Sequence, residues 1–308
     1  MQGFQDTIDA AVPVHGPKSS RQHGLALAVL AAISLVWGFN WVVLKIGVRH
    51  ADPFEFLAWR FAITAACLFG AGAVLGRPMR LVHAPQLLVI GLLQTTATFG
   101  LATWALQSGA VGKTAVLNYT MPFWVTLFAW PLLGERPSAG QGVALAIGLA
   151  GLMMLIRPSS APGWPELLAL ASGIAWGLGV VVTKRLQTRA RIDTLTLIAW
   201  QVLFGGGALV VLALLVPGRP AQWSGALVFA ILYNAVLVGA AGWFLWFWAL
   251  ARLDAGLASF GILAVPVLGA LFSASLLGER PTSLDWSGMA LIVAALGLAA
   301  RASLRRPA

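Results

Sequence analysis

The six residues Leu-Leu-Gly-Glu-Arg-Pro at positions 132–137 return unchanged at positions 276–281, which lie 144 positions later. Further matches occur at the same spacing: Pro122 with Pro266, Gly112 with Gly256, Trp104 with Trp248, and the pair 105–106 with 249–250. Several matches at one spacing indicate that the chain contains the same structural unit twice, a pattern typical of membrane transporters.

The composition indicates that lipid surrounds these units. Of the 308 residues 59% are hydrophobic and only 10% are charged, and the mean hydropathy is +0.85. Windows of about twenty residues give ten apolar spans, at positions 25–47, 54–75, 87–106, 112–133, 140–156, 167–186, 195–216, 226–250, 257–277 and 284–302. The runs are continuously apolar instead of alternating, which excludes transmembrane strands. The sequence therefore predicts an all-α integral membrane protein with ten transmembrane helices.

Few residues remain outside these spans. Positions 1–24 are polar and predict a disordered tail before an uncleaved first helix. Positions 25–156 and 167–302 form the two repeats, positions 157–166 link them, and positions 303–308 form a second tail. The single cysteine, Cys67, lies in the second span, so no intramolecular disulfide is expected.

The basic residues predict an orientation. With the N-terminus in the cytoplasm, thirteen lysines and arginines lie on the cytoplasmic side and six on the other, while Arg60 lies within a span. This excess favours cytoplasmic N- and C-termini. The net charge of +10 is then explained by basic loops at anionic lipid, and no nucleic-acid motif is present.

The repeats are predicted to be inverted. Each repeat has five spans, and because five is an odd number, the second repeat enters the membrane from the opposite side. At a spacing of 139, Ala175-Trp176-Gly177 also aligns with Val36-Trp37-Gly38, and Lys184 aligns with Lys45. Inverted repeats commonly enclose a substrate site near the membrane midplane, which opens to each side in turn.

These features together resemble the EamA branch of the drug/metabolite transporter superfamily. The resemblance covers residues 25 to 302 and includes the Trp-Gly near the start of each half, the proline in the fourth and ninth spans, and the Leu-Gly-Glu-Arg-Pro motif. It implies an inner-membrane exporter or permease of amino acids or other small metabolites. It also implies that the first, third, fourth, sixth, eighth and ninth spans surround the cavity, with the fifth and tenth at the periphery.

Polar side chains inside the spans are the first candidates for substrate binding, because they are costly in hydrocarbon unless they face protein, water or ligand. They are Asn40, Gln94, Thr95, Thr98, Asn118, Tyr119, Tyr233 and Asn234. The alternative is that they hydrogen-bond neighbouring helices and never contact substrate.

Tryptophans form the second group, since the chain has fourteen. An indole can cover an aromatic or cationic ligand. Trp41 and one of Trp243 or Trp246 are predicted to contact substrate, and the alternative is contact with lipid or packing between helices. Trp164 and Trp223 lie near span ends, where the interfacial aromatic belt explains them.

Pro122 and Pro266 occupy matching positions in the middle of two spans. A proline there removes a backbone donor and kinks the helix, so both are predicted to be hinges near the binding site. A kink that serves only packing is the alternative.

Several charged residues near span ends have structural explanations. Arg60 lies inside the second span, where a charge is a candidate for a functional role. Because it lies within two turns of the start of its helix, a structural role is expected instead, in which it reaches the outer membrane interface or pairs with Glu55 or Asp52. Lys113 heads a predicted cavity helix and could meet a carboxylate. Glu135 and Glu279 precede proline-started helices and are interpreted as helix-start residues.

Missing groups limit the mechanism. The ten acidic residues and four histidines lie in tails, loops or span edges, so no buried proton relay is evident. No Walker loop, hydrolase motif or metal-spaced cluster occurs, so no cofactor, metal or catalytic residue is expected. Facilitated movement or exchange follows as the hypothesis.

The sequence thus predicts a transporter that moves an amino acid or a related small metabolite outward by alternating access. The alternatives are an exporter of drugs or lipophilic cations and, from another class, a membrane scaffold or intramembrane enzyme. Small residues from Gly140 to Gly151 in the fifth span allow close helix approach within one chain or between two copies in a homodimer.

Overall fold

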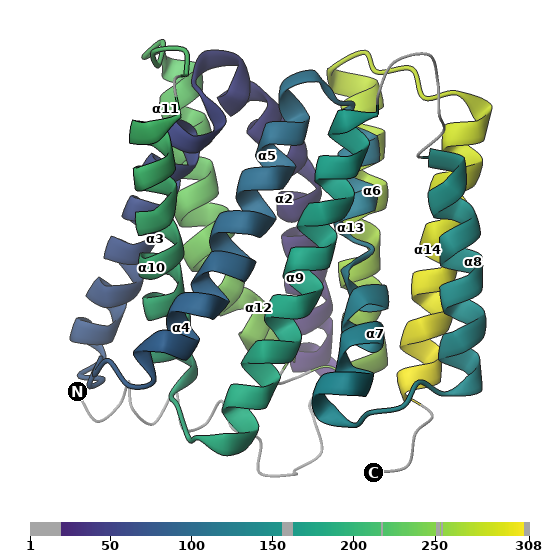
Figure 1. Cartoon of the computed structure of the whole chain (residues 1–308), viewed down its shortest axis with the longest axis horizontal. Helices are drawn as coiled ribbons and strands as arrows, with labels where there is room; N and C mark the ends of the chain where they lie inside the picture. Colours follow the sequence, from purple (N-terminus) through teal and green to yellow (C-terminus); the bar gives the residue numbers. More distant parts are fainter. Residues whose placement is uncertain (1–19, 156–162, 217, 251–252, 254, 305–308) are drawn as a thin grey trace.

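The computed structural model describes residues 20–155, 163–216, 218–250, 253 and 255–304. The described part is helical and contains no strand. In chain order its elements are α2 (Ser20–His50), α3 (Pro53–Val74), α4 (Ala84–Gly91), the π-helix η1 (Leu92–Ala97), α5 (Thr98–Ser108), α6 (Val111–Asn118), α7 (Met121–Leu133), α8 (Ala139–Leu155), α9 (Trp164–Arg189), α10 (Thr194–Leu215), α11 (Gly225–Leu232), the π-helix η2 (Tyr233–Ala241), α12 (Gly242–Leu250), α13 (Ala255–Leu276) and α14 (Ser283–Leu304). Figure 1 shows them side by side in one bundle, with α2 beginning and α14 ending at the same end.

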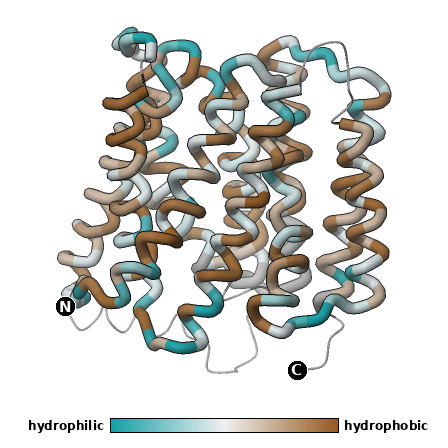
Figure 2. The backbone as a smooth tube through the Cα atoms, in the orientation of Figure 1, coloured by the Kyte–Doolittle hydropathy of each residue, from teal (hydrophilic) through white to brown (hydrophobic). Residues whose placement is uncertain are grey.

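The helices have the length and composition of membrane spans. Among the described residues, seven helical segments are long and apolar enough to cross a membrane, and three apolar segments, Ala139–Leu155, Gly225–Ala241 and Leu263–Leu276, are shorter. Each predicted span overlaps one helix or one run of consecutive helices. Hydrophilic residues gather in the connections at the two ends (Figure 2). Large apolar side chains such as Leu214, which is 81% exposed, cover the outside, as expected for a surface in contact with lipid.

Helices α2–α8, which we call the first part of the chain, pack against helices α9–α14, which we call the second part. α8 packs along α14, and α3 packs along α10. α2 contacts α13 and the run α11–η2–α12, while α9 contacts α6, α7 and the run η1–α5. Because these contacts join segments far apart in the sequence, the interior lies between the two parts.

The repeated Leu-Gly-Glu-Arg-Pro motif ends one helix and leads into the next in both copies. Gly134 and Gly278 follow α7 and α13 with φ values of +75° and +68°, a conformation that glycine adopts without a steric penalty. The proline of each motif then precedes α8 or α14 by a short loop. The motif therefore fixes matching turns.

The two π-helices were not expected from the sequence. η1 and η2 each interrupt a long helix, so the third and eighth predicted spans share the same irregularity. At the end of η1, the hydroxyl of Thr98, the first residue of α5, donates to the Leu93 carbonyl over 2.8 Å, which adds a side-chain hydrogen bond to the widened turn. π-Helical segments inside α-helices often occur at functional sites.

The two prolines predicted to be hinges differ in their positions. The helix ends at Asn118, a turn follows at 119–120, and Pro122 lies in the first turn of α7 instead of inside a helix. Proline is favoured there because the first N–H groups of a helix have no helical partner. Pro266 lies within the continuous helix α13.

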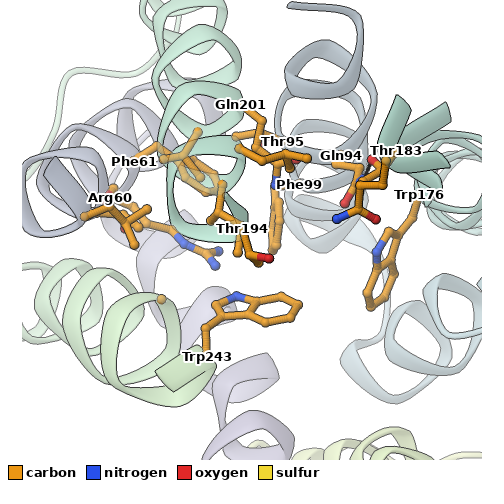
Figure 3. Close-up of a pocket in the computed structure, with 17 residues that line it drawn as sticks. Arg60, Phe61, Gln94, Thr95, Phe99, Trp176, Thr183, Thr194, Gln201 and Trp243 are labelled. Atoms are coloured by element: carbon orange, nitrogen blue, oxygen red, sulfur yellow. Dashed lines mark hydrogen bonds between the residues drawn. The ribbon is translucent and has the colours of Figure 1, made fainter. Parts of the chain in front are cut away.

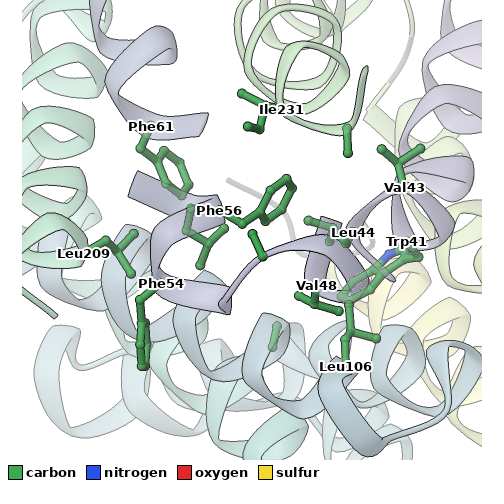
Figure 4. Packing of buried hydrophobic residues seen from close by; sticks show 14 of the residues in the cluster. Trp41, Val43, Leu44, Val48, Phe54, Phe56, Phe61, Leu106, Leu209 and Ile231 are labelled. Atoms are coloured by element: carbon green, nitrogen blue, oxygen red, sulfur yellow. The ribbon is translucent and has the colours of Figure 1, made fainter. Parts of the chain in front are cut away.

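The main apolar core lies between the two parts of the chain. Figure 4 shows Phe56 beside Phe61 from α3, Leu44 and Trp41 from α2, and Leu209 from α10. Moving one side chain of this size from water into an apolar interior is favourable by about 1.5–3 kcal/mol. Between helices in lipid, the stabilisation comes mainly from close packing.

The small residues of the fifth span pack within the chain. A Cβ atom on Gly151 would lie 2.8 Å from the Gly288 carbonyl oxygen, and a Cβ on Gly148 would lie 2.5 Å from Phe123. Gly142 has nothing within 4 Å at its Cβ position. Close helix approach here therefore joins α8 to α14 and α7, and a homodimer stays a prediction.

The predicted tails and linker fall mostly outside the described residues, which exclude 1–19, 156–162 and 305–308. Among the described residues, α2 begins at Ser20, within the predicted N-terminal tail, and α14 continues to Leu304, within the predicted C-terminal tail.

Candidate functional site

A cavity of about 230 Å³ lies between α3, η1, α5, α9, α10, η2 and α12. Its polar lining residues are Arg60, Thr64, Gln94, Thr95, Thr183, Gln187, Thr194 and Gln201, and its aromatic ones are Phe61, Phe99, Trp176 and Trp243. Figure 3 shows these side chains converging from both parts of the chain. The volume is below the roughly 300–1,000 Å³ of sites for drug-sized ligands, so it suits a small solute.

The cavity extends toward one end of the bundle. Gln187, near the end of α9, and Thr194, the first residue of α10, are exposed members of its lining. The connection between α9 and α10 lies at the end where α2 begins and α14 ends (Figure 1). We call this end the α9–α10 end.

The opposite end, which we call the α5–α6 end, is held together by polar contacts between the two parts. The Glu279 carboxylate accepts hydrogen bonds from the Val111 and Gly112 N–H groups, over 2.6 and 3.2 Å. Lys113 pairs with Asp285 at 2.9 Å and with Glu166 at 3.8 Å. The carboxylates that Lys113 meets are thus the protein's own.

The two motif glutamates differ in their surroundings. Glu279 caps the start of α6, whereas Glu135 forms a 2.6 Å ion pair with Lys184, with 41% and 52% of the two side chains exposed. The interpretation of both as structural residues agrees with these contacts.

Arg60 is the charged residue of the cavity, and its predicted surroundings were wrong. The residue is only 3% exposed, and its guanidinium makes no ion pair with Glu55 or Asp52. Instead, its guanidinium carbon lies 4.7 Å from the Phe61 ring centroid and 4.3 Å from that of Phe99. Asp52 accepts a hydrogen bond from Phe54 N–H and caps its own helix instead.

Several polar atoms at the cavity have no partner. The Nε and Nη1 atoms of Arg60 and the Oε1 atom of Gln201 are buried without a hydrogen bond among the described residues. Gln94, by contrast, donates to Thr183 over 2.6 Å and so connects η1 to α9. The Thr64 hydroxyl shares its one proton between the Arg60 carbonyl at 2.9 Å and the Ala235 carbonyl at 3.3 Å, and so connects α3 to η2. The free donors and acceptor are the groups that a ligand can satisfy.

Three of the residues predicted from the sequence line the cavity: Gln94, Thr95 and Trp243. The others lie in helix contacts. Asn118 donates to Ser172, Tyr233 to the Val36 carbonyl, and Asn234 to the Ala230 carbonyl. Thr98 stabilises η1, as described above.

The remaining predicted aromatic residues pack against rings. Trp41 lies edge-on to Tyr119 with centroids 6.4 Å apart, and Tyr119 contacts Trp176 at 5.5 Å. Trp246 contacts Trp37 at 5.9 Å. Asn40 is buried, and its Oδ1 atom has no hydrogen-bond partner among the described residues. Six of the predicted substrate-binding residues are therefore absent from the lining of this cavity: Asn40, Trp41, Asn118, Tyr119, Asn234 and Trp246.

The sequence analysis missed much of the lining. Arg60 carried the strongest signal, since it was the one basic residue well inside a span, but it was assigned to the interface. Thr183, Gln187 and Gln201 are polar residues on long helices without any spacing that separates them from lipid-interface residues. No group of three or more histidines, cysteines or acids able to hold a metal ion occurs among the described residues.

Comparisons with known proteins agree with this architecture. The model of the EamA-like transporter family matches residues 22–157 and again residues 163–301. The chain is 29% identical over 261 residues to the uncharacterized transporter YoaV of Bacillus subtilis, covering 82% of this chain and 89% of that protein.

Some relatives carry functional names. A probable amino-acid metabolite efflux pump of Escherichia coli is 27% identical, covering 90% of this chain and 94% of that protein. A riboflavin transporter of Rhizobium johnstonii is 30% identical, covering 92% and 90%. A protein of known crystal structure shares the fold with a TM-score of 0.62 and 23% identity, covering 89% of this chain and 96% of that one. With family matches over both parts of a helical membrane protein, the chain belongs to the EamA-like transporter family and is a transporter, not an enzyme.

Proposed function

We propose that this protein is a secondary transporter that moves amino acids or related small metabolites across the inner membrane by alternating access. The cavity carries the proposal, because it lies between the two parts of the chain and its lining reaches the α9–α10 end, while polar contacts join the two parts at the α5–α6 end. A solute site that is closed at one end by contacts between two halves is what alternating access requires.

The proposed architecture is ten transmembrane helices in two inverted halves, 25–156 and 167–302. The contacts support this architecture, because equivalent helices have equivalent neighbours. The contact of α2 with α13 corresponds to the contact of α9 with α6 and α7. The contact of α2 with α11–α12 corresponds to the contact of α9 with α5. Exchanging the two halves therefore reproduces these principal contacts. The matching π-helices and the two family matches point the same way.

In this proposal both termini lie in the cytoplasm, so the cavity described here is open to the cytoplasm. Arg185, Arg189 and Arg191 lie at the same end as the mouth of the cavity, and basic residues favour the cytoplasmic side. A solute would enter from inside and leave outward after the α5–α6 end opens.

The size and chemistry of the cavity favour a small polar metabolite over the alternatives. A lipophilic cation would need a cavity of indoles without a carboxylate-binding group, yet Arg60 places a positive charge in the lining. The names of the E. coli and R. johnstonii relatives, for an amino-acid metabolite and for riboflavin, also point to metabolites. A scaffold would not require such a cavity.

The proposed energy source is the substrate gradient or exchange with a second solute. The lining residues include no aspartate, glutamate or histidine that could carry a coupling proton. Transport would then proceed without an imposed pH gradient.

Reconstitution into liposomes tests the proposal. Purified protein in vesicles preloaded with one unlabelled solute at a time should accumulate the same solute in labelled form by counterflow, for at least one amino acid or for riboflavin. The uptake should saturate with concentration and should be the same with and without a pH gradient. Uptake equal to that of protein-free vesicles for every solute would contradict the transport function, and a requirement for the gradient would contradict the proposed energy source.

A further inference from the structure

Arg60 has no counter-charge among the residues that the structure describes. The residue is 3% exposed and lies in a candidate membrane span, and no described carboxylate pairs with it. The other described ion pairs use Arg77, Lys113 and Lys184. A buried charge without a partner is strongly unfavourable, and an intramembrane arginine usually faces a cavity and has a function.

The contacts that Arg60 does make leave its hydrogen bonds unused. The rings of Phe61 and Phe99 lie 4.7 and 4.3 Å from the guanidinium carbon, close enough for cation–π attraction. Those contacts hold the guanidinium group but accept none of its in-plane donors, and Nε and Nη1 stay without partners. Figure 3 shows the group reaching into the cavity from α3, with Trp243 on the facing side.

A planar guanidinium offers pairs of parallel N–H donors that match the two oxygens of a carboxylate. We propose that Arg60 is a substrate-binding residue and that the cavity selects small organic acids whose carboxylate binds Arg60 and whose apolar or aromatic body lies among Phe61, Phe99, Trp176 and Trp243. This assignment rests on the proposed transport function and specifies the substrate class of the same site.

Gln201, a second polar residue of the lining, narrows the class of substrates. The Oε1 atom of Gln201 is buried without a partner in the same cavity, so it can accept a hydrogen bond from an N–H or O–H group of the ligand. An acid that also carries an amino or hydroxyl donor satisfies both groups. An amino acid fits this description, as does a hydroxy acid.

Four probes that share one aromatic ring separate these requirements. They are phenylalanine, phenylalaninamide, phenylpropionate and phenethylamine, measured by calorimetry on the purified full-length protein. The two carboxylates should bind at least about tenfold more tightly than the amide and the amine, which corresponds to ~1.4 kcal/mol. The difference between phenylalanine and phenylpropionate measures the contribution of the donor.

Substitutions then assign the carboxylate preference to a residue. In Arg60→Gln the preference for phenylalanine over phenylalaninamide should disappear, while Arg60→Lys keeps part of it because the charge stays but the paired donors are lost. Arg49→Gln is the matched control, since Arg49 is exposed at the other end of the bundle and outside the cavity. It should keep the full preference.

Stability provides an independent readout. Because Arg60 is buried without a counter-charge, ligand-free Arg60→Gln should unfold at the same temperature as the wild type or at a higher one. A clearly lower unfolding temperature, together with an unchanged carboxylate preference, would overturn the proposal and make Arg60 a structural residue.

The two proposals fail in different ways. If neither carboxylate binds the wild type, or if the amide binds equally well, the assignment to Arg60 is overturned even when counterflow of another solute succeeds. If no solute shows counterflow, the transport function itself fails.

Discussion

Replacing Glu279 with alanine is expected to open the α5–α6 end of the bundle, whereas the same replacement of Glu135 leaves that end closed. The two residues occupy the same position in the repeated motif, but only Glu279 caps a helix in the other half, through the Val111 and Gly112 N–H groups. Hydrogen bonds to a charged group contribute about 1.5–3 kcal/mol each. The ion pair of Glu135 with Lys184 is exposed and contributes about 0–1 kcal/mol.

If this cap stabilises the closed α5–α6 end, removing it shifts the equilibrium between conformations by roughly tenfold or more. Spin labels on cysteines at Ala110 and Arg280, in a Cys67→Ala background, report the distance across this end. The distance distribution should move toward longer values in Glu279→Ala. It should match the parent in Glu135→Ala. Equal distributions in all three proteins would show that the cap does not hold the end closed.

Replacing Gly91 with alanine is expected to destabilise the whole protein, while replacing Gly207 with alanine is tolerated. A Cβ atom on Gly91 would lie 2.5 Å from the Gln201 carbonyl oxygen and 2.9 Å from the Gly205 nitrogen. Both atoms belong to the α10 backbone, which cannot move aside as a side chain could. Overpacking of this kind typically costs about 1–3 kcal/mol.

Gly207 is the matched control on α10, because a Cβ there meets nothing within 4 Å. The unfolding midpoint, followed by tryptophan fluorescence in detergent, should fall in Gly91→Ala and stay near the wild-type value in Gly207→Ala. Since η1 directly follows Gly91 and carries Gln94 and Thr95, ligand affinity should fall as well. A Gly91→Ala protein as stable as the control would mean that α4 and α10 do not approach this closely.

The sequence predicted the membrane class and the positions of the apolar spans, because long uninterrupted apolar runs have few other structures available to them. It also identified the repeated motif, whose Gly134 and Gly278 adopt positive φ values in the turns after α7 and α13. It did not predict η1 and η2, since a π-helical turn depends on how neighbouring helices crowd a segment. Nor did it predict the break after Asn118, because proline is compatible with either a kink or a new helix start.

The candidate site was predicted only in part, for a physical reason. A polar residue in a span must face protein, water or ligand, but the amino-acid sequence does not distinguish these three surroundings. Gln94 lines the cavity, whereas Asn118, also within a predicted span, donates to Ser172. Arg60 was misassigned because its position near the helix start allowed its long side chain to reach the interface, and only the packing of Phe61 and Phe99 holds it inward.

The central claim is that this cavity opens to each side of the membrane in turn. In a Cys67→Ala background, a cysteine in place of Gln94 lies in the cavity lining, and one in place of Thr103 lies buried outside it. Each is exposed to a membrane-impermeant maleimide, first in right-side-out and then in inside-out vesicles. The account predicts that the cysteine at position 94 reacts from both sides and is protected by substrate, while the cysteine at position 103 reacts from neither. Reaction at position 94 from one side alone would contradict it.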